Sequence, residues 1–147
     1  MSVYWDTSCL LKLYCREPDS DRYLHQIGKS AEPLITSSLT QSEIYFALLQ
    51  KQTRSETGQK SAQEIFSEYM DDLNRGLIFQ VPIGMALLQK TREVADRCFG
   101  VEPPVFLRTL DGIHLATAME AGCTRLVTTD QRMKSAACVL GISLLAP

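Results

Sequence analysis

The sequence contains no long apolar run and no recognisable targeting segment. Its hydrophobic stretches stay short of the roughly 18 to 20 residues that a helix needs to cross a bilayer. The first residues, MSVYWDTSCLL, have neither the charged start nor the apolar core of a secretory signal. We therefore expect a cytoplasmic protein without membrane contacts.

Paired cysteines and glycine-rich phosphate loops are also missing. The five cysteines are an odd number and form no CxxC pair: Cys9, Cys15, Cys98, Cys123 and Cys138. Because four of them stand in apolar or helix-like surroundings, they predict neither disulfides nor structural zinc. The eight glycines form neither a P-loop nor a GxGxxG motif, which argues against nucleotide binding of those two kinds.

The chain has no excess of positive charge. Fifteen Lys and Arg face 17 Asp and Glu, and the net charge is -2. Contacts with nucleic acid would therefore depend on a local patch, for which the candidates are Lys12, Arg108, Arg132 and Lys134. The alternative is that these four are solvated surface. A chain of 147 residues, 45% of them hydrophobic, fits one globular domain over residues 1–147.

Short β-type runs alternate with segments of helical periodicity. The runs lie at residues 3–5, 34–36, 77–81, 125–128 and 142–145. Between them, residues 61–73 have apolar positions at helical spacing, and so do 85–98 and 107–122. Strands that alternate with helices predict an α/β fold with a parallel sheet covered on both faces.

Four acidic residues stand at junctions of this alternation. Asp6 and Asp130 each follow a strand and precede a helix, while Glu43 and Asp111 are expected in first helical turns. Each alone is explained as a helix cap or a partner of the helix dipole, and Thr40 with Glu43 matches a capping box. In open parallel sheets, however, ligands bind at the carboxyl ends of the strands, where such residues would meet.

A meeting of four carboxylates requires a counter-charge. Like charges about 4 Å apart repel by roughly 4 kcal/mol per pair at an effective dielectric near 20. Mg²⁺ or Mn²⁺ binds carboxylate oxygens, activates water and stabilises charge on a phosphoryl group. The chemistry indicated is hydrolysis of a phosphodiester. His114 stands three residues after Asp111 and could share a metal site, but a lone helical histidine is more often structural.

Four segments resemble the acidic motifs of PIN-domain nucleases, in particular the VapC-type toxins. They are YWDTSCLLKLY, SSLTQSEIYFALL, LRTLDGIHLATAMEAG and LVTTDQRMKSAACVLG, in this order and over nearly the whole chain. The resemblance implies a three-layer α/β/α domain with a central parallel sheet of about five strands. It also implies a site for one or two Mg²⁺ or Mn²⁺ ions at one edge of that sheet.

Carried over motif by motif, the resemblance assigns roles to individual residues. Asp6, Asp111 and Asp130 look like metal ligands, and Glu43 resembles the second-motif acid, an outer ligand or general base. Thr128 is similar to the family's hydroxyl residue before the fourth acid, and Thr7 is a weaker candidate. His114 then becomes structural. The family often has Ala where Gly112 stands and a small aliphatic residue where Cys9 stands.

The resemblance implies a metal-dependent endoribonuclease that forms a homodimer and is inhibited by a cognate antitoxin. The alternative is a PIN-fold RNA-binding or scaffold module that keeps the acids but does not cleave. A phosphatase with an aspartyl nucleophile would require a DxDx[TV]-like motif, whereas this chain reads DTSC after Trp5. We therefore set the phosphatase aside.

Overall fold

A five-stranded parallel sheet forms the centre of the molecule. The computed structural model describes residues 2–147. Its strands are β1 (Val3–Trp5), β2 (Leu34–Ser37), β3 (Ile78–Val81), β4 (Arg125–Val127) and β5 (Ser143–Leu144). They pair in parallel in the order β3-β2-β1-β4-β5. All five predicted strands are confirmed, each within two residues at either end.

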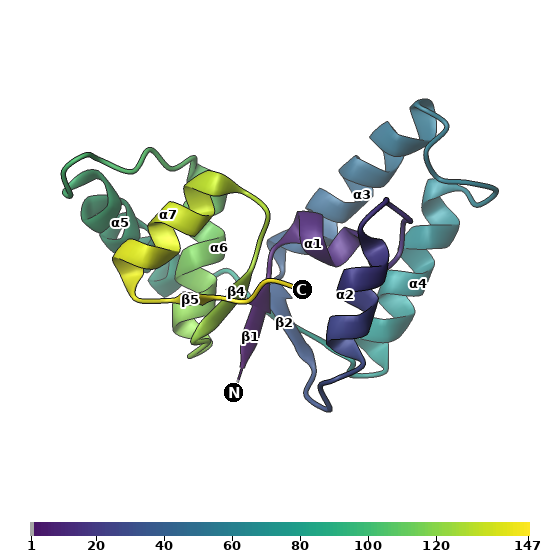
Figure 1. Ribbon diagram of the computed structural model, residues 1–147, viewed down its shortest axis with the longest axis horizontal. Helices are drawn as coiled ribbons and strands as arrows, with labels where there is room; N and C mark the ends of the chain where they lie inside the picture. Colours follow the sequence, from purple (N-terminus) through teal and green to yellow (C-terminus); the bar gives the residue numbers. More distant parts are fainter. Residues whose placement is uncertain (1) are drawn as a thin grey trace.

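Seven helices cover the two faces of the sheet (Figure 1). One face carries α1 (Thr7–Leu11), α2 (Ser20–Ile27), α3 (Leu39–Thr53) and α4 (Ala62–Asn74). The other face carries α5 (Met85–Phe99), α6 (Thr109–Glu120) and α7 (Gln131–Leu140). The predicted three-layer α/β/α architecture is therefore confirmed. None of the helices within residues 2–147 has the length and apolar character required to cross a membrane.

Neighbouring strand residues supply the two cores. In β1, Tyr4 packs with α5, α6 and α7, whereas Trp5 packs with α1 to α4. Leu126 and Val127 of β4 divide between the same two cores. Successive side chains of a strand point to opposite faces, so a strand covered on both faces contributes neighbouring residues to both cores. This explains why VYW and RLV lack the alternation of a half-exposed strand.

Local signals fix several helix ends. Ser61 caps α4, and Glu64 completes the reciprocal capping box. After α7, Gly141 has a φ of 75°, a left-handed conformation that favours glycine at a helix C-terminus. In the third motif, α6 begins at Thr109, because Arg108 has the extended backbone of the cap position. The Arg108 side chain therefore starts at the point where the preceding loop enters α6.

The order of the strands determines where a ligand site can form. From β1 the chain moves outward through β2 to β3, and then returns to place β4 and β5 on the other side of β1. The direction of winding thus reverses between β1 and β4, and ligands in open α/β sheets bind at such a point. Asp6 directly follows β1, and Asp130 follows β4 by three residues.

Candidate active site

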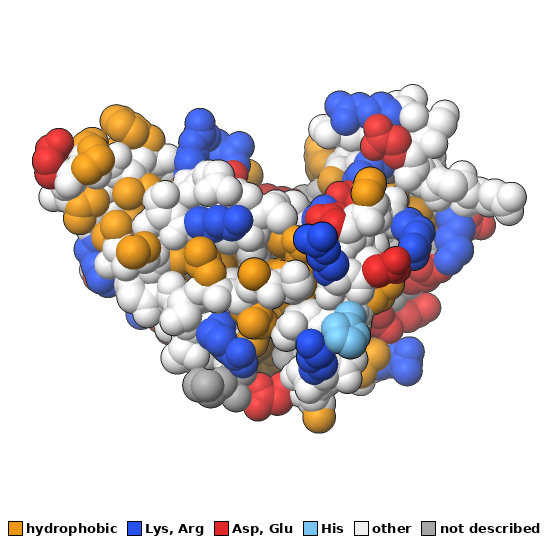
Figure 2. Space-filling view, viewed as in Figure 1, with side chains coloured by type: hydrophobic (Ala, Val, Ile, Leu, Met, Phe, Trp, Pro, Cys, Tyr) orange, Lys and Arg blue, Asp and Glu red, His pale blue; other side chains and the backbone are white. Residues whose placement is uncertain are grey.

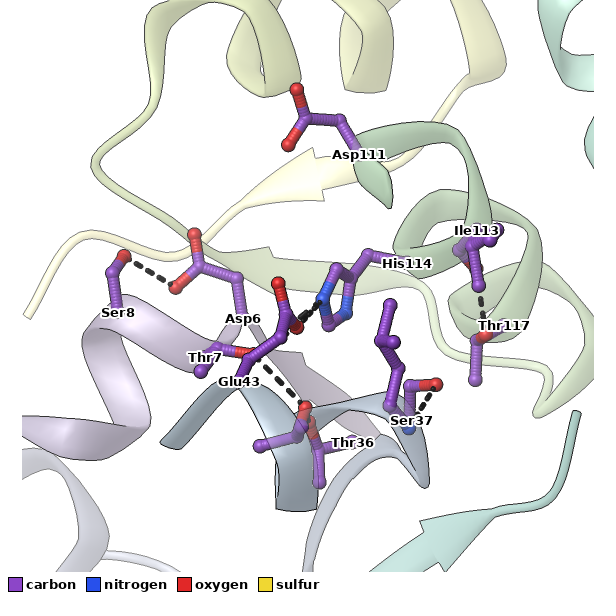
Figure 3. Close-up of polar contacts among 12 residues, drawn as sticks. Asp6, Thr7, Ser8, Thr36, Ser37, Glu43, Asp111, Ile113, His114 and Thr117 are labelled. Carbon is purple, nitrogen blue, oxygen red and sulfur yellow. Dashed lines mark hydrogen bonds and ion pairs between the residues drawn. The ribbon is translucent and has the colours of Figure 1, made fainter. Parts of the chain in front are cut away.

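The four predicted acids line one pocket at this reversal point. Asp6, Glu43, Asp111 and Asp130 all face a cavity of about 550 Å³, although they are up to 124 positions apart in the chain. Figure 2 shows the surface hollowed between the two groups of helices. Figure 3 shows Asp111 across from Asp6 and Glu43. The structure thus places the four predicted acids in the lining of one pocket, and their assignment as metal ligands and catalytic groups stays a prediction.

Asp6 is held on both carboxylate oxygens. Its Oδ1 accepts hydrogen bonds from the backbone N–H of Cys9 and from the Ser8 hydroxyl, both at 2.9 Å. Its Oδ2 accepts a hydrogen bond from the Thr128 hydroxyl. The residue is only 4% exposed, so its position is fixed by neighbours on β1, α1 and β4. Asp6 both caps α1 and lines the pocket. Its explanation as a helix cap is therefore compatible with its prediction as a residue of the site.

Thr128 connects the first acid with the fourth. Besides donating to Asp6, its Oγ1 accepts a hydrogen bond from the backbone N–H of Asp130 at 3.1 Å. Asp130 caps α7 by accepting a hydrogen bond from Met133 N at 3.0 Å. The hydroxyl therefore couples the orientations of two carboxylates that come from opposite ends of the chain.

Glu43 occupies the second turn of α3, not the first. The helix begins at Leu39, where the backbone N–H bonds to the Ser37 hydroxyl at 3.1 Å. The predicted Thr40–Glu43 capping box is therefore wrong, because Thr40 is already inside the helix. Its hydroxyl lies instead 2.7 Å from Thr36 Oγ1 and 3.1 Å from Thr7 Oγ1. Thr7 in turn donates to Glu43 Oε1 at 2.7 Å, which confirms its place in the pocket.

His114 reaches the same carboxylate from the opposite face of the sheet. Its Nε2 lies 2.5 Å from Glu43 Oε1, and its Nδ1 lies 2.6 Å from the Tyr4 hydroxyl. The imidazole is 3% exposed. An Nε2–H that donates to Glu43 leaves Nδ1 to accept from Tyr4, so the neutral tautomer satisfies both contacts.

The interpretation of His114 as structure alone is therefore incomplete. The residue is buried, as a structural histidine is, yet it also positions an acid of the site. No local pattern could have shown this, because Tyr4 and Glu43 are 110 and 71 residues away. Burial raises the pKa of Glu43, but hydrogen bonds from His114 and Thr7 more than offset this and hold that pKa below its ordinary value.

Asp111 is paired with Arg108 at the entrance to the pocket. Arg108 Nε donates to Asp111 Oδ2 at 2.8 Å and Nη2 donates to Oδ1 at 3.3 Å, while Nη2 also lies 3.4 Å from Asp130 Oδ2. A permanently buried arginine would have contradicted a cation site. The Arg108 side chain, however, is 63% exposed, so it covers the acids from the solvent side.

The other predicted cations differ in their surroundings. Lys12 is buried and donates to Glu17 at 2.6 Å and to Asp19 at 2.8 Å. Burial lowers the pKa of Lys12, but the hydrogen bonds and charges of Glu17 and Asp19 raise it by more, so the net shift of the pKa is upward. This lysine is thus committed to an ion-pair network and is not free for RNA. Arg132 is exposed and Lys134 half-buried, and neither lines the pocket.

The donor set suits a hard divalent cation. All four acids supply carboxylate oxygens, with the hydroxyls of Thr7 and Ser8 in the same lining, and Mg²⁺ and Mn²⁺ prefer such ligands. Within residues 2–147, however, no three carboxylate or imidazole groups stand close enough together to hold a metal ion as they are. The oxygen donors therefore suit such an ion, although they do not form a complete set of protein ligands as they stand.

Comparison with known proteins adds independent information. The PIN domain family model matches residues 3–138. Ribonuclease VapC46 of Mycobacterium tuberculosis is 35% identical over 148 residues, which covers 99% of this chain and 98% of that protein.

Two solved structures share the fold at low sequence identity. VapC20 of Mycobacterium tuberculosis, a toxin that cleaves the sarcin–ricin loop, is 13% identical with a TM-score of 0.69, covering 92% of this chain and 95% of its own. VapBC2 of Rickettsia felis, solved with a promoter DNA fragment, is 14% identical with a TM-score of 0.65, covering 99% and 98%. The family-model match and the full-length identity show that this chain belongs to the PIN-domain family, among the VapC ribonucleases.

Proposed function

We propose that this protein is a metal-dependent endoribonuclease that hydrolyses RNA phosphodiester bonds, and that it is the toxin of a toxin–antitoxin pair. The observation that carries the proposal is the convergence of Asp6, Glu43, Asp111 and Asp130 in one pocket at the reversal point of the sheet. Membership of the VapC ribonucleases supports the same activity. The non-cleaving alternative has no observation in its favour, since no acidic motif is missing.

Asp6, Asp111 and Asp130, with Glu43 as an inner or outer ligand, are proposed to hold Mg²⁺ or Mn²⁺. A bound divalent ion of this kind supplies Lewis acidity toward water and phosphate oxygens. Thr128 fixes the Asp6 carboxylate by its hydrogen bond, so that less ordering is required when a cation arrives. The chain thereby provides oriented carboxylates at the place where RNA phosphate would enter.

Glu43 is the proposed proton acceptor for the attacking water. Both hydrogen bonds to this carboxylate engage Oε1, from Thr7 and from His114. In the described chain no further hydrogen bond is made by Oε2, which leaves that oxygen for water. A lowered pKa keeps the carboxylate ionised at neutral pH, the form that a general base requires.

The proposed partners follow from the family. Rickettsia felis VapBC2 was solved as a pair of proteins on promoter DNA, and we propose that an antitoxin likewise binds and inhibits this chain. We further propose a homodimer, a single domain over residues 1–147 and a cytoplasmic site of action, where RNA substrates are present. An acidic pocket attracts a basic side chain from a partner, which would exclude both metal and RNA.

Cleavage of a defined RNA by purified protein tests the proposed activity. Wild type should cut in Mn²⁺ or Mg²⁺ and stop in excess chelator, while Asp111→Asn should remain folded without cutting. Asp21→Asn is a matched control, because Asp21 is an exposed aspartate in the first turn of α2, outside the pocket. Equal cutting by wild type with and without chelator would contradict the proposed chemistry, and loss of activity in the control would invalidate the comparison.

A further inference from the structure

Arg108 makes a forked contact with the acids of the open side of the pocket. Two of its nitrogens engage both oxygens of Asp111, at 2.8 and 3.3 Å, and one of them also reaches Asp130 at 3.4 Å. Planar guanidinium groups bind carboxylates and phosphates in this two-pronged way. The contact is therefore a specific one, made by the residue that caps the helix bearing Asp111.

The contact is also open to solvent on one side. The Asp111 side chain is 9% exposed and that of Asp130 is 30% exposed, against 63% for Arg108. An arginine that approaches from outside can leave without disturbing the core. An ion pair whose cation is exposed to solvent is weakened by water, so the guanidinium can be displaced by a competitor that offers more charge.

A divalent cation in this pocket would be such a competitor. It would require the carboxylate oxygens of Asp111 and Asp130, which are the oxygens that Arg108 engages. Those acids face Arg108, and within residues 2–147 no three groups form a ready metal site. A divalent ion that takes these oxygens therefore competes with the forked contact.

The two lysines of the pocket do not share this property. Lys12 is held by Glu17 and Asp19, and Lys51 lies 3.3 Å from Glu17. None of these acids belongs to the four-carboxylate cluster. A metal ion bound by the four-carboxylate cluster would leave the ion pairs of Lys12 and Lys51 intact. It would, however, bind the two carboxylates that pair with Arg108, and the guanidinium would then be unpaired at the entrance to the pocket.

We propose that Arg108 exchanges partners during the reaction cycle: it pairs with Asp111 and Asp130 before metal binds, and with a phosphate of the RNA backbone afterwards. This inference rests on the proposed function. It makes Arg108 a competitor of the metal and a substrate-positioning residue, so its removal has effects of opposite sign on the two ligands. A side chain with a merely structural role would not produce that pair of effects.

The test compares the full-length wild type with Arg108→Ala and Arg108→Gln. Mn²⁺ binding is measured by calorimetry without RNA, and kcat and KM are measured on one RNA oligonucleotide at saturating Mn²⁺. Both variants should bind Mn²⁺ more tightly, by up to about fivefold. Both should raise KM for RNA roughly tenfold or more, since a hydrogen bond to a charged group is lost, while kcat changes little.

Arg16→Ala is the matched control for these measurements. Arg16 makes an exposed ion pair with Asp21 at 3.1 Å, and neither residue lines the pocket. The control should change neither Mn²⁺ affinity nor KM. Thermal melting without metal verifies that the Arg108 variants are folded, which their exposed position leads us to expect.

The outcomes separate this inference from the proposed function. If wild type and both variants neither bind Mn²⁺ nor cleave RNA, the metal-dependent function fails and the inference with it. If wild type binds and cleaves but the variants match its Mn²⁺ affinity, only the exchange is overturned. If Mn²⁺ affinity rises while KM stays unchanged, Arg108 is a counter-ion alone and its role toward RNA is overturned.

Discussion

The two sides of the acidic pocket are held in different ways. Asp6 and Glu43 receive their hydrogen bonds from the first turn of α1, from His114 on α6 and from Thr128 just after β4, all within the folded frame of the domain. Both oxygens of Asp111 are instead engaged by one exposed arginine, which also reaches Asp130. We refer to these as the fixed side, Asp6 with Glu43, and the open side, Asp111 with Asp130.

The difference shows how one cluster of like charges can be both stable and accessible. Hydrogen-bond donors on the fixed side lower the cost of desolvating two carboxylates, and they belong to the ordered first turn of α1, to α6 and to the segment after β4. On the open side the compensating charge is an exposed arginine, Arg108, which can move away from the carboxylates. A site of this construction is folded before it binds a cation and needs rearrangement on one side only.

The largest effect is expected from Asp6→Asn on the fixed side. Asparagine can still accept the hydrogen bond from Cys9 N, so α1 stays capped, but the negative charge is lost. Metal-assisted catalysis contributes several kcal/mol, so we expect cleavage to fall roughly 100-fold or more. Cleavage rates at fixed Mn²⁺, together with melting temperatures, check this prediction. A folded variant that cleaves at the wild-type rate would remove Asp6 from the mechanism.

His114→Ala should weaken the fixed side without removing an acid. Loss of the Nε2 contact frees the Glu43 carboxylate to rotate, and partners that orient ligands typically contribute about 10- to 100-fold. We expect kcat to fall within that range, with partial rescue in His114→Gln, which can donate again. His25→Ala is the control, since this other histidine is exposed on α2. Equal kcat in both alanine variants would show that Glu43 needs no such support.

The pH dependence of stability should differ between the wild type and Glu43→Gln. Burial raises its pKa, but the hydrogen bonds from His114 and Thr7 give a net lowering. A carboxyl with a lowered folded pKa stabilises the fold fully above its unfolded pKa of about 4.3 and loses this contribution as pH falls through the folded value. Melting of wild type and Glu43→Gln from pH 7 to pH 3 should therefore converge on acidification. A constant difference across that range would contradict the assignment.

The smallest expected effect concerns the helix that carries the open side. A Cβ at Gly112 would lie 3.4 Å from Thr91 Cγ2, an ordinary contact, and alanine is favoured over glycine inside helices by up to about 1 kcal/mol. Gly112→Ala should stabilise the protein by that order. Gly100→Ala is the contrast, because its Cβ would come within 2.7 Å of Asp96 O. Denaturant unfolding measures both, and destabilisation by Gly112→Ala would show that α6 cannot accept a side chain there.

Much of the fold could be predicted from the sequence because its signals are local. The strands are short apolar runs, and the apolar positions at helical spacing in residues 61–73 mark α4. The approach of Asp6 to Asp130 also followed, since Asp6 comes directly after β1 and Asp130 three residues after β4, and the carboxyl ends of these parallel strands share one edge. These inferences require only periodicity and the handedness of β-α-β connections.

The parts that failed depend on contacts between distant segments. Thr40 and Glu43 have capping-box spacing, but the turn at Ser37 moves the start of α3 so that Glu43 enters the second turn and meets His114. The Tyr4–His114–Glu43 chain joins three separate elements. The sequence predicts Arg108 as a contact for RNA phosphate or as solvated surface, since its spacing from Asp111 says nothing about Asp130 on another helix.

The central claim is that these acids bind a divalent cation that supports RNA cleavage. The most direct test is a crystal structure of the full-length protein soaked in Mn²⁺, with anomalous scattering to locate the ion. We expect an anomalous peak in the pocket, bound by Asp6, Asp111 and Asp130, with Arg108 turned away from Asp111. A protein that cleaves RNA while its Mn²⁺ lies elsewhere, or while the pocket contains no peak, would contradict it.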